Sequence, residues 1–138
     1  MAYRPIALVV EDDELQRAAA AVLLEDNEME VFQCGSGEAA QLILDEIGGS
    51  IRFMFTDASL AGSVTGADLA HIAASKYPKL RVVVTSGRDQ PSLPTGIKFI
   101  PKPWNSLDVL REANEACSDL DNSIAEGHAS RWRNHYCG

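Results

Sequence analysis

Short apolar runs alternate along the chain with longer segments in which apolar residues recur at helical spacing. The short runs are rich in valine, isoleucine and phenylalanine, and most of them end at polar or charged residues, a pattern typical of strands buried on both faces of a sheet. Five strands are therefore predicted, at residues 6–10, 29–33, 51–56, 80–84 and 98–100.

The longer segments predict helices, because their apolar side chains recur every three or four residues. Gly48 and Gly49 end the second segment, Pro78 prevents the third from continuing, and Asn105 or Ser106 is suited to cap the last one. Helices are expected at residues 15–26, 39–47, 67–77 and 106–117. Strands that alternate with helices indicate an α/β fold, a doubly wound parallel sheet with helices on both faces.

One interval departs from this alternation. Residues 88–96, between the fourth and fifth strands, contain Pro91, Pro94 and Gly96, and their apolar residues show no helical spacing. A proline inside a helix removes a hydrogen bond and clashes with the preceding turn, at a cost of about 3 kcal/mol. The fourth helix of the pattern is therefore predicted to be short or absent.

Length, composition and charge narrow the possible functions. The chain has 138 residues, of which 46% are hydrophobic and 23% charged, as in one ordinary globular domain. Its net charge of −8 argues against nucleic-acid binding, which requires a basic surface. No export signal or membrane span is recognisable, and three cysteines without CxxC spacing suit reduced thiols. A cytoplasmic protein that binds protein partners or a metal ion is expected.

Candidate functional residues lie just past four of the predicted strands. The carboxyl ends of parallel strands share one edge of a sheet, so these side chains are expected to converge there. Carboxylates about 4 Å apart repel by about 4 kcal/mol per pair, so such a group needs a cation or raised pKa values. An all-oxygen site with few protein ligands suits Mg²⁺. The residues are Glu11, Asp12, Asp13, Asp57, Thr85, Ser86, Lys102 and Pro103.

The same residues indicate phosphoryl chemistry. Lys102 adds a positive charge and Thr85 a hydroxyl group, which together suit a tetrahedral dianion. A carboxylate can be the nucleophile in phosphoryl transfer, and Asp57 stands alone at the end of the central strand. Each piece also has a plain structural interpretation, since acids before a helix stabilise its N-terminus and a Thr-Ser pair forms turns. Their order at successive strand ends favours the functional interpretation.

These segments resemble the receiver domains of two-component response regulators. The matching stretches are ALVVEDDELQR, FTDASLAG, VVVTSG and FIPKPW, and the similarity covers about residues 5–118. It leaves 119–138 as a C-terminal tail that is expected to be flexible. The resemblance implies a flavodoxin-like, five-stranded sheet of order 2-1-3-4-5. It also implies a signalling phosphoacceptor that catalyses only its own phosphorylation and dephosphorylation. The tail is too short for a DNA-binding domain, so a stand-alone receiver is expected.

The resemblance also assigns roles to individual residues. Asp57 aligns with the phosphorylated aspartate, Thr85 with the switch hydroxyl and Phe99 with the switch aromatic residue. Lys102 aligns with the phosphate-binding lysine, and its peptide bond to Pro103 is expected to be cis. Glu11 replaces the commoner aspartate and is expected to reach the metal directly or through water. The implied Mg²⁺ ligands are Glu11, Asp12, Asp57 and the backbone carbonyl of Ser59.

The implied partners are a histidine kinase or histidine phosphotransfer protein as donor, and a downstream protein whose binding phosphorylation switches. The interval at 88–96 alters the family's usual output surface and is similar to segments in receivers of hybrid histidine kinases. Two alternatives remain open. One is a receiver-like interaction module that works without phosphorylation. The other is an aspartyl-phosphate phosphatase of the haloacid dehalogenase type, in which a second aspartate would occupy the position of Ser59.

Overall fold

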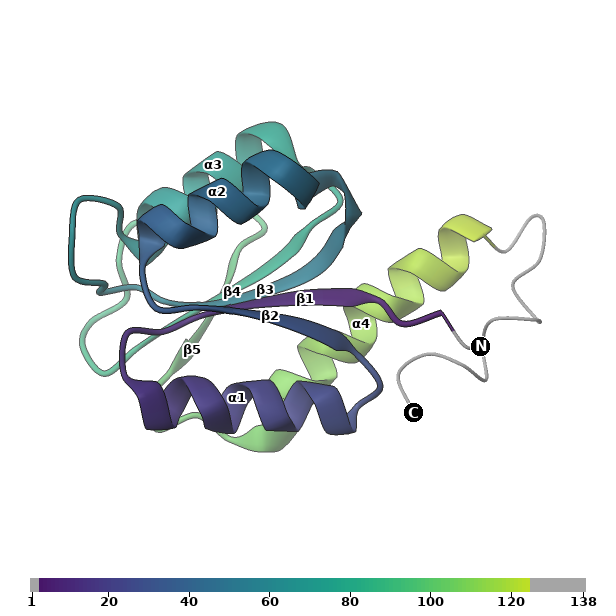
Figure 1. The fold of residues 1–138 in the computed structure, drawn as a ribbon, viewed down its shortest axis with the longest axis horizontal. Coiled ribbons are helices and arrows are strands. Elements are labelled where there is room, and N and C mark those ends of the chain that lie inside the picture. Colours follow the sequence, from purple (N-terminus) through teal and green to yellow (C-terminus); the bar gives the residue numbers. More distant parts are fainter. Residues whose placement is uncertain (1–2, 125–138) are drawn as a thin grey trace.

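The computed structural model describes residues 3–124, which form a five-stranded sheet between two layers of helices (Figure 1). All neighbouring strands are parallel, and their order is β2-β1-β3-β4-β5. The predicted fold class and strand order are confirmed, and each strand boundary lies within two residues of its predicted position. The strands are β1 (Ile6–Val10), β2 (Glu30–Cys34), β3 (Ile51–Asp57), β4 (Arg81–Ser86) and β5 (Lys98–Pro101).

The helices divide the core into two clusters, one on each face of the sheet. Helices α1 and α4 cover one face, and α2 and α3 cover the other (Figure 1). Phe53 and Met54 are adjacent in β3 and both fully buried, but they belong to different clusters because successive strand side chains point to opposite faces. The helices are α1 (Glu14–Asp26), α2 (Gly37–Ile47), the 3₁₀-helix η1 (Gly48–Ser50), α3 (Gly66–Lys76) and α4 (Ser106–Ile124).

Side-chain caps fix where the helices begin. Asp13 lies in the acidic run after β1, and its Oδ1 accepts a hydrogen bond of 2.9 Å from the backbone N–H of Gln16. At α4, the Oδ1 of Asn105 accepts from the N–H of Leu107 at 2.8 Å, so Asn105 supplies a side-chain cap at this helix start. These caps satisfy N–H groups that have no partner within the helix.

The segment between β4 and β5 contains no helix, as predicted. Residues 87–97 form bends and a turn, and the turn has Gly96 at a φ of 94°. Leu93 and Ile97 are partly buried and pack against the cluster that α2 and α3 cover. The segment therefore contributes apolar side chains to the core without the regular hydrogen bonding of a helix.

The last helix is longer than predicted. Helix α4 runs to Ile124, seven residues past the expected end at Cys117, so the start of the predicted tail is helical. The remainder of the predicted flexible tail, residues 125–138, lies outside the described residues. No helix within residues 3–124 is long and apolar enough to cross a membrane.

The cysteine prediction is confirmed at one position and wrong at another. Cys34, at the end of β2, is buried and free, and burial raises the pKa of its thiol. Cys117 is disulfide-bonded, which contradicts the expectation of reduced thiols.

Close packing around the end of β3 gives a first testable prediction. Gly66 begins α3, and a Cβ at this position would overlap the backbone carbonyl of Asp57. We expect Gly66→Ala to lower the free energy of unfolding in urea by about 2 kcal/mol, because the backbone must shift to relieve the overlap. Gly49→Ala is the control, since a Cβ there meets nothing within 4 Å. Equal stability of the two variants would contradict the prediction.

Candidate functional site

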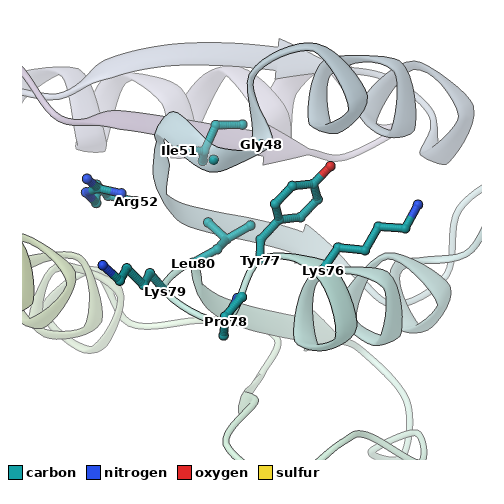
Figure 2. Close-up of a pocket in the computed structure, with 9 residues that line it drawn as sticks. Gly48, Ile51, Arg52, Lys76, Tyr77, Pro78, Lys79 and Leu80 are labelled. Atoms are coloured by element: carbon teal, nitrogen blue, oxygen red, sulfur yellow. The ribbon is translucent and has the colours of Figure 1, made fainter.

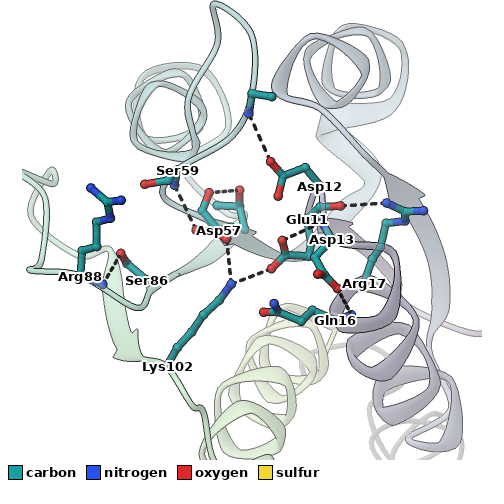
Figure 3. Close-up of polar contacts among 12 residues, drawn as sticks. Glu11, Asp12, Asp13, Gln16, Arg17, Asp57, Ser59, Ser86, Arg88 and Lys102 are labelled. Carbon is teal, nitrogen blue, oxygen red and sulfur yellow. Dashed lines mark hydrogen bonds and ion pairs between the residues drawn. The ribbon is translucent and has the colours of Figure 1, made fainter.

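The polar residues predicted at the strand ends converge at one edge of the sheet (Figure 3). Glu11 directly follows β1, Asp57 ends β3, and Lys102 directly follows β5. The Nζ of Lys102 lies 2.8 Å from Oε1 of Glu11 and 2.8 Å from Oδ2 of Asp57. The parallel strand register places these positions at the same end of the sheet. Glu11 and Asp57, which lie 91 and 45 residues before Lys102 in the sequence, therefore meet at its ammonium group.

This three-residue group is largely withdrawn from solvent. The side chains of Lys102, Asp57 and Glu11 are 18%, 11% and 8% exposed. Burial raises the pKa of Glu11, and the hydrogen bond from Lys102 acts against that rise. Burial lowers the pKa of Lys102, but hydrogen bonds to Asp57 and Glu11 outweigh it, so the net change is upward. The ammonium group thus stabilises two carboxylates that would otherwise repel each other.

Backbone groups hold the second oxygen of each carboxylate. The N–H of Ser59 donates to Oδ1 of Asp57 at 3.0 Å, and the N–H of Asp13 donates to Oε2 of Glu11 at 3.0 Å. Each carboxylate therefore accepts one hydrogen bond from Lys102 and one from the loop that follows its own strand. These contacts orient both groups.

Asp12 adds a third carboxylate beside this group. One carboxylate oxygen from each of Glu11, Asp12 and Asp57 lies within 4.8 Å of the others. Asp12 is exposed, and its Oδ2 accepts a long hydrogen bond of 3.4 Å from the N–H of Ala61. When all three carboxylates are ionised, the one ammonium group offsets a single charge, so two negative charges remain. The oxygen ligands, the charge and the exposed third acid fit a small divalent cation such as Mg²⁺.

Thr85 places a hydroxyl group without a partner at the same edge. It pairs with Asp57 in the β3–β4 register and is 2% exposed. Among the described residues its Oγ1 has no hydrogen-bond partner. It lines a cavity of about 10 Å³ together with Asp57, Glu11 and Trp104. A buried hydroxyl without a partner is costly unless a ligand satisfies it, and an oxygen-rich group on Asp57 would do so.

The other predicted site residues lie around this centre. The Lys102–Pro103 peptide bond is cis, the geometry that the resemblance implies. Asp13 caps α1 and is not one of the three clustered acids. Phe99, on β5, is partly buried and packs on the face covered by α2 and α3, so the structure does not place it in the cavity with Thr85.

The sequence analysis missed two residues that shape the site. Trp104 lines the cavity beside Thr85, and its ring meets Phe55 edge to face with centroids 5.5 Å apart. Arg17 donates from Nη1 to the carbonyl of Glu11 at 2.9 Å, which ties α1 to the end of β1. Trp104 directly follows the Lys102–Pro103 pair in the sequence, and this position could have indicated that it lies at the site. The contact of Arg17 depends on how the first helix turns and had no signal in the sequence.

A comparison with solved structures finds receiver domains that have a similar fold. The receiver domain of the hybrid histidine kinase CckA is 29% identical with a TM-score of 0.70, covering 80% of this chain and 97% of that chain. A response regulator receiver protein from Pseudomonas putida is 26% identical with a TM-score of 0.68, covering 83% and 99%. One from Sinorhizobium medicae is 21% identical with a TM-score of 0.74, covering 82% and 94%. No family model and no curated protein matches the chain.

The fold is that of response-regulator receiver domains, and the resemblance extends over most of the chain. The expected similarity to receivers of hybrid histidine kinases is confirmed by the CckA domain. The fold and these comparisons support a receiver role in two-component phosphorelay signalling.

Lys102 provides a test of the electrostatics. We expect Lys102→Met to lower the free energy of unfolding by about 2 kcal/mol at pH 7 without metal, because it leaves Glu11 and Asp57 facing each other with no buried cation. Adding Glu11→Gln to that variant should restore part of the loss, since one carboxylate is removed. Urea denaturation measures both. Wild-type stability of Lys102→Met would show that the ammonium group does not offset the repulsion.

Proposed function

We propose that this chain is the phosphoacceptor receiver domain of a two-component response regulator, with Asp57 as the acceptor. The observation that carries the proposal is the joint position of Asp57, Lys102 and Thr85. The Asp57 carboxylate has an ammonium group 2.8 Å away, and Thr85 contributes a buried hydroxyl without a described partner. A carboxylate beside a fixed cation and a free hydroxyl suits the attachment of a phosphoryl group. We propose residues 5–118 as the receiver domain.

The proposed reaction transfers a phosphoryl group from a phosphohistidine donor to Asp57. A carboxylate oxygen of Asp57 forms a bond to phosphorus while the bond between phosphorus and the donor nitrogen breaks. Lys102 remains as a positive charge beside the phosphoryl oxygens, and the Thr85 hydroxyl donates a hydrogen bond to one of them. The N–H of Ser59 orients the carboxylate before transfer, through its 3.0 Å hydrogen bond to Oδ1. The main contributions are positioning and charge neutralisation.

Mg²⁺ is the proposed cofactor, held by Asp12, Asp57 and the Ser59 carbonyl, with Glu11 directly or through water. When bound, it neutralises charge on the acids and on the phosphoryl oxygens. Glu11 already uses Oε1 for Lys102 and Oε2 for the N–H of Asp13. Its contact with the metal therefore competes with these two bonds, whereas the exposed Asp12 is less constrained.

A histidine kinase or histidine phosphotransfer protein is the proposed donor, and a downstream protein is the proposed output partner. The hybrid-kinase receiver among the similar structures supports a phosphorelay partner. We propose a signalling role, with catalysis limited to the domain's own phosphorylation and dephosphorylation. The position of Ser59, where the phosphatase alternative requires an aspartate, disfavours a general phosphatase. A phosphorylation-independent module is distinguished by the next experiment.

The acceptor is tested by incubation with a small phosphodonor and Mg²⁺, followed by intact mass measurement. The wild-type chain should gain one phosphate, and Asp57→Asn should gain none, because an amide is not a competent nucleophile in this reaction. Asp13→Asn is the matched control: it removes a neighbouring charge, and asparagine still caps α1. Undiminished labelling of Asp57→Asn would refute the acceptor assignment. An unlabelled wild-type chain would favour the phosphorylation-independent module.

The metal site is tested by calorimetric titration with Mg²⁺. Asp12→Asn should bind at least about tenfold more weakly than wild type, because it loses one of the few anionic ligands. Without metal it should be at least as stable as wild type, since one like-charge repulsion is relieved. Asp13→Asn should bind Mg²⁺ like the wild-type chain. Equal affinity of Asp12→Asn and wild type would place the site elsewhere.

A further inference from the structure

A second cavity lies at the other end of β3 from Asp57. Figure 2 shows the residues that line it. It has a volume of about 250 Å³ and is bounded by η1, the start of β3 and the turn between α3 and β4. Strand β3 leads from Ile51 at this cavity to Asp57, and seven residues of extended strand span about 20 Å. The cavity, called the Tyr77 cavity below, is therefore separate from the phosphoacceptor site.

The Tyr77 cavity has an apolar, fixed interior. Ile51 and Leu80 line it and are 1% and 7% exposed. The ring of Tyr77 forms a wall, and its hydroxyl donates a hydrogen bond of 2.9 Å to the carbonyl of Leu44. The same ring packs so closely against Gly48 that a Cβ there would lie 2.6 Å from Cζ of the ring. Contacts on two sides thus hold the ring in place, and the cavity does not depend on a ligand to form.

Three cations are among the residues that line this cavity. Arg52, Lys76 and Lys79 line the cavity, and its lining contains no acidic residue. Figure 2 shows Arg52 and Lys79 at one end and Lys76 at the other, with Tyr77 between them. Within the described part of the chain none of the three forms an ion pair, whereas Arg4 and Lys98 each pair with a glutamate. Cations without partners are concentrated here in a chain of net charge −8.

We propose that the Tyr77 cavity binds a small organic anion, a single ring or short aliphatic group that carries one carboxylate or phosphate. The apolar interior suits the ring, and the cations Arg52 and Lys79 at one end of the cavity suit the anionic group. Ligand cavities are commonly about 300–1,000 Å³, so this smaller one suits a compact molecule. The site goes beyond the proposed phosphoacceptor function and does not require it.

The proposal is tested by two-dimensional ¹H–¹⁵N NMR on the full chain. Benzoate and phenyl phosphate serve as anionic probes, and benzyl alcohol is the uncharged match of similar size. At least one of the two anions should cause saturable shifts of the Gly49 and Leu80 amide signals, and that anion is called the preferred anion below. Benzyl alcohol should bind at least about fivefold more weakly, because it lacks the charge that the cations attract. No saturable shift with either anion, or equal affinity for benzyl alcohol, would overturn the proposal.

Two variants locate the binding. Arg52→Gln combined with Lys79→Gln should weaken the preferred anion by at least about fivefold. Arg111→Gln is the control, since it removes an exposed cation that lines no part of the cavity. Gly49→Phe should also weaken binding, because it places a bulky ring on a residue that lines the cavity and has room for a side chain. Wild-type affinity of the double variant would overturn the proposed role of the cations, and wild-type affinity of Gly49→Phe would overturn the location.

Discussion

The ammonium group of Lys102 lies between two buried carboxylates that belong to the ends of different strands. Its 2.8 Å contacts to Glu11 and Asp57 join the end of β5 to the ends of β1 and β3. Burying a cation between two acids is costly unless each charge finds a partner, and here every member of the trio has one. This requirement fixes the relative positions of three strand ends, and the rest of the site is arranged around it.

The trio also explains why the edge of the sheet is suited to chemistry. Lys102 offsets part of the repulsion between Glu11 and Asp57, but the addition of Asp12 leaves the group with excess negative charge. A domain built for stability alone would have no need to gather three acids there. The arrangement is stable enough to fold, and its excess negative charge allows it to bind a cation. Functional sites commonly combine these two properties.

Much of this arrangement was predictable from the sequence, because the parallel sheet converts strand order into spatial proximity. The apolar runs defined the strands, so Glu11, Asp57, Thr85 and Lys102 could be expected at one edge. The apolar runs did not predict which individual side chains contact each other. That Lys102 bonds to both carboxylates, and that Phe99 faces away from the cavity of Thr85, depends on side-chain packing in three dimensions.

The length of α4 shows a different limit. The apolar pattern does not stop at the predicted end, Cys117, because Leu120 and Ile124 follow it at helical spacing. The five polar residues among 118–124 obscured this continuation, so the predicted end of the helix was set too early. The sequence offered no prediction of the Tyr77 cavity, because its lining comes from two segments, residues 48–52 and 76–80, that lie far apart in the chain.

Hydrogen bonds of Ser86 connect the segment at residues 87–97 to the phosphoacceptor site. The carbonyl of Ser86 accepts from the N–H of Lys102 at 2.9 Å, and its Oγ accepts from the N–H of Arg88 at 3.0 Å. Ser86 follows Thr85 directly, so a shift of Thr85 toward a group on Asp57 would move a residue bonded to both Lys102 and the segment. A loop held by few hydrogen bonds rearranges at lower cost than a helix. The absence of the helix therefore does not remove a route from the site to the surface; it replaces a rigid element with a more deformable one.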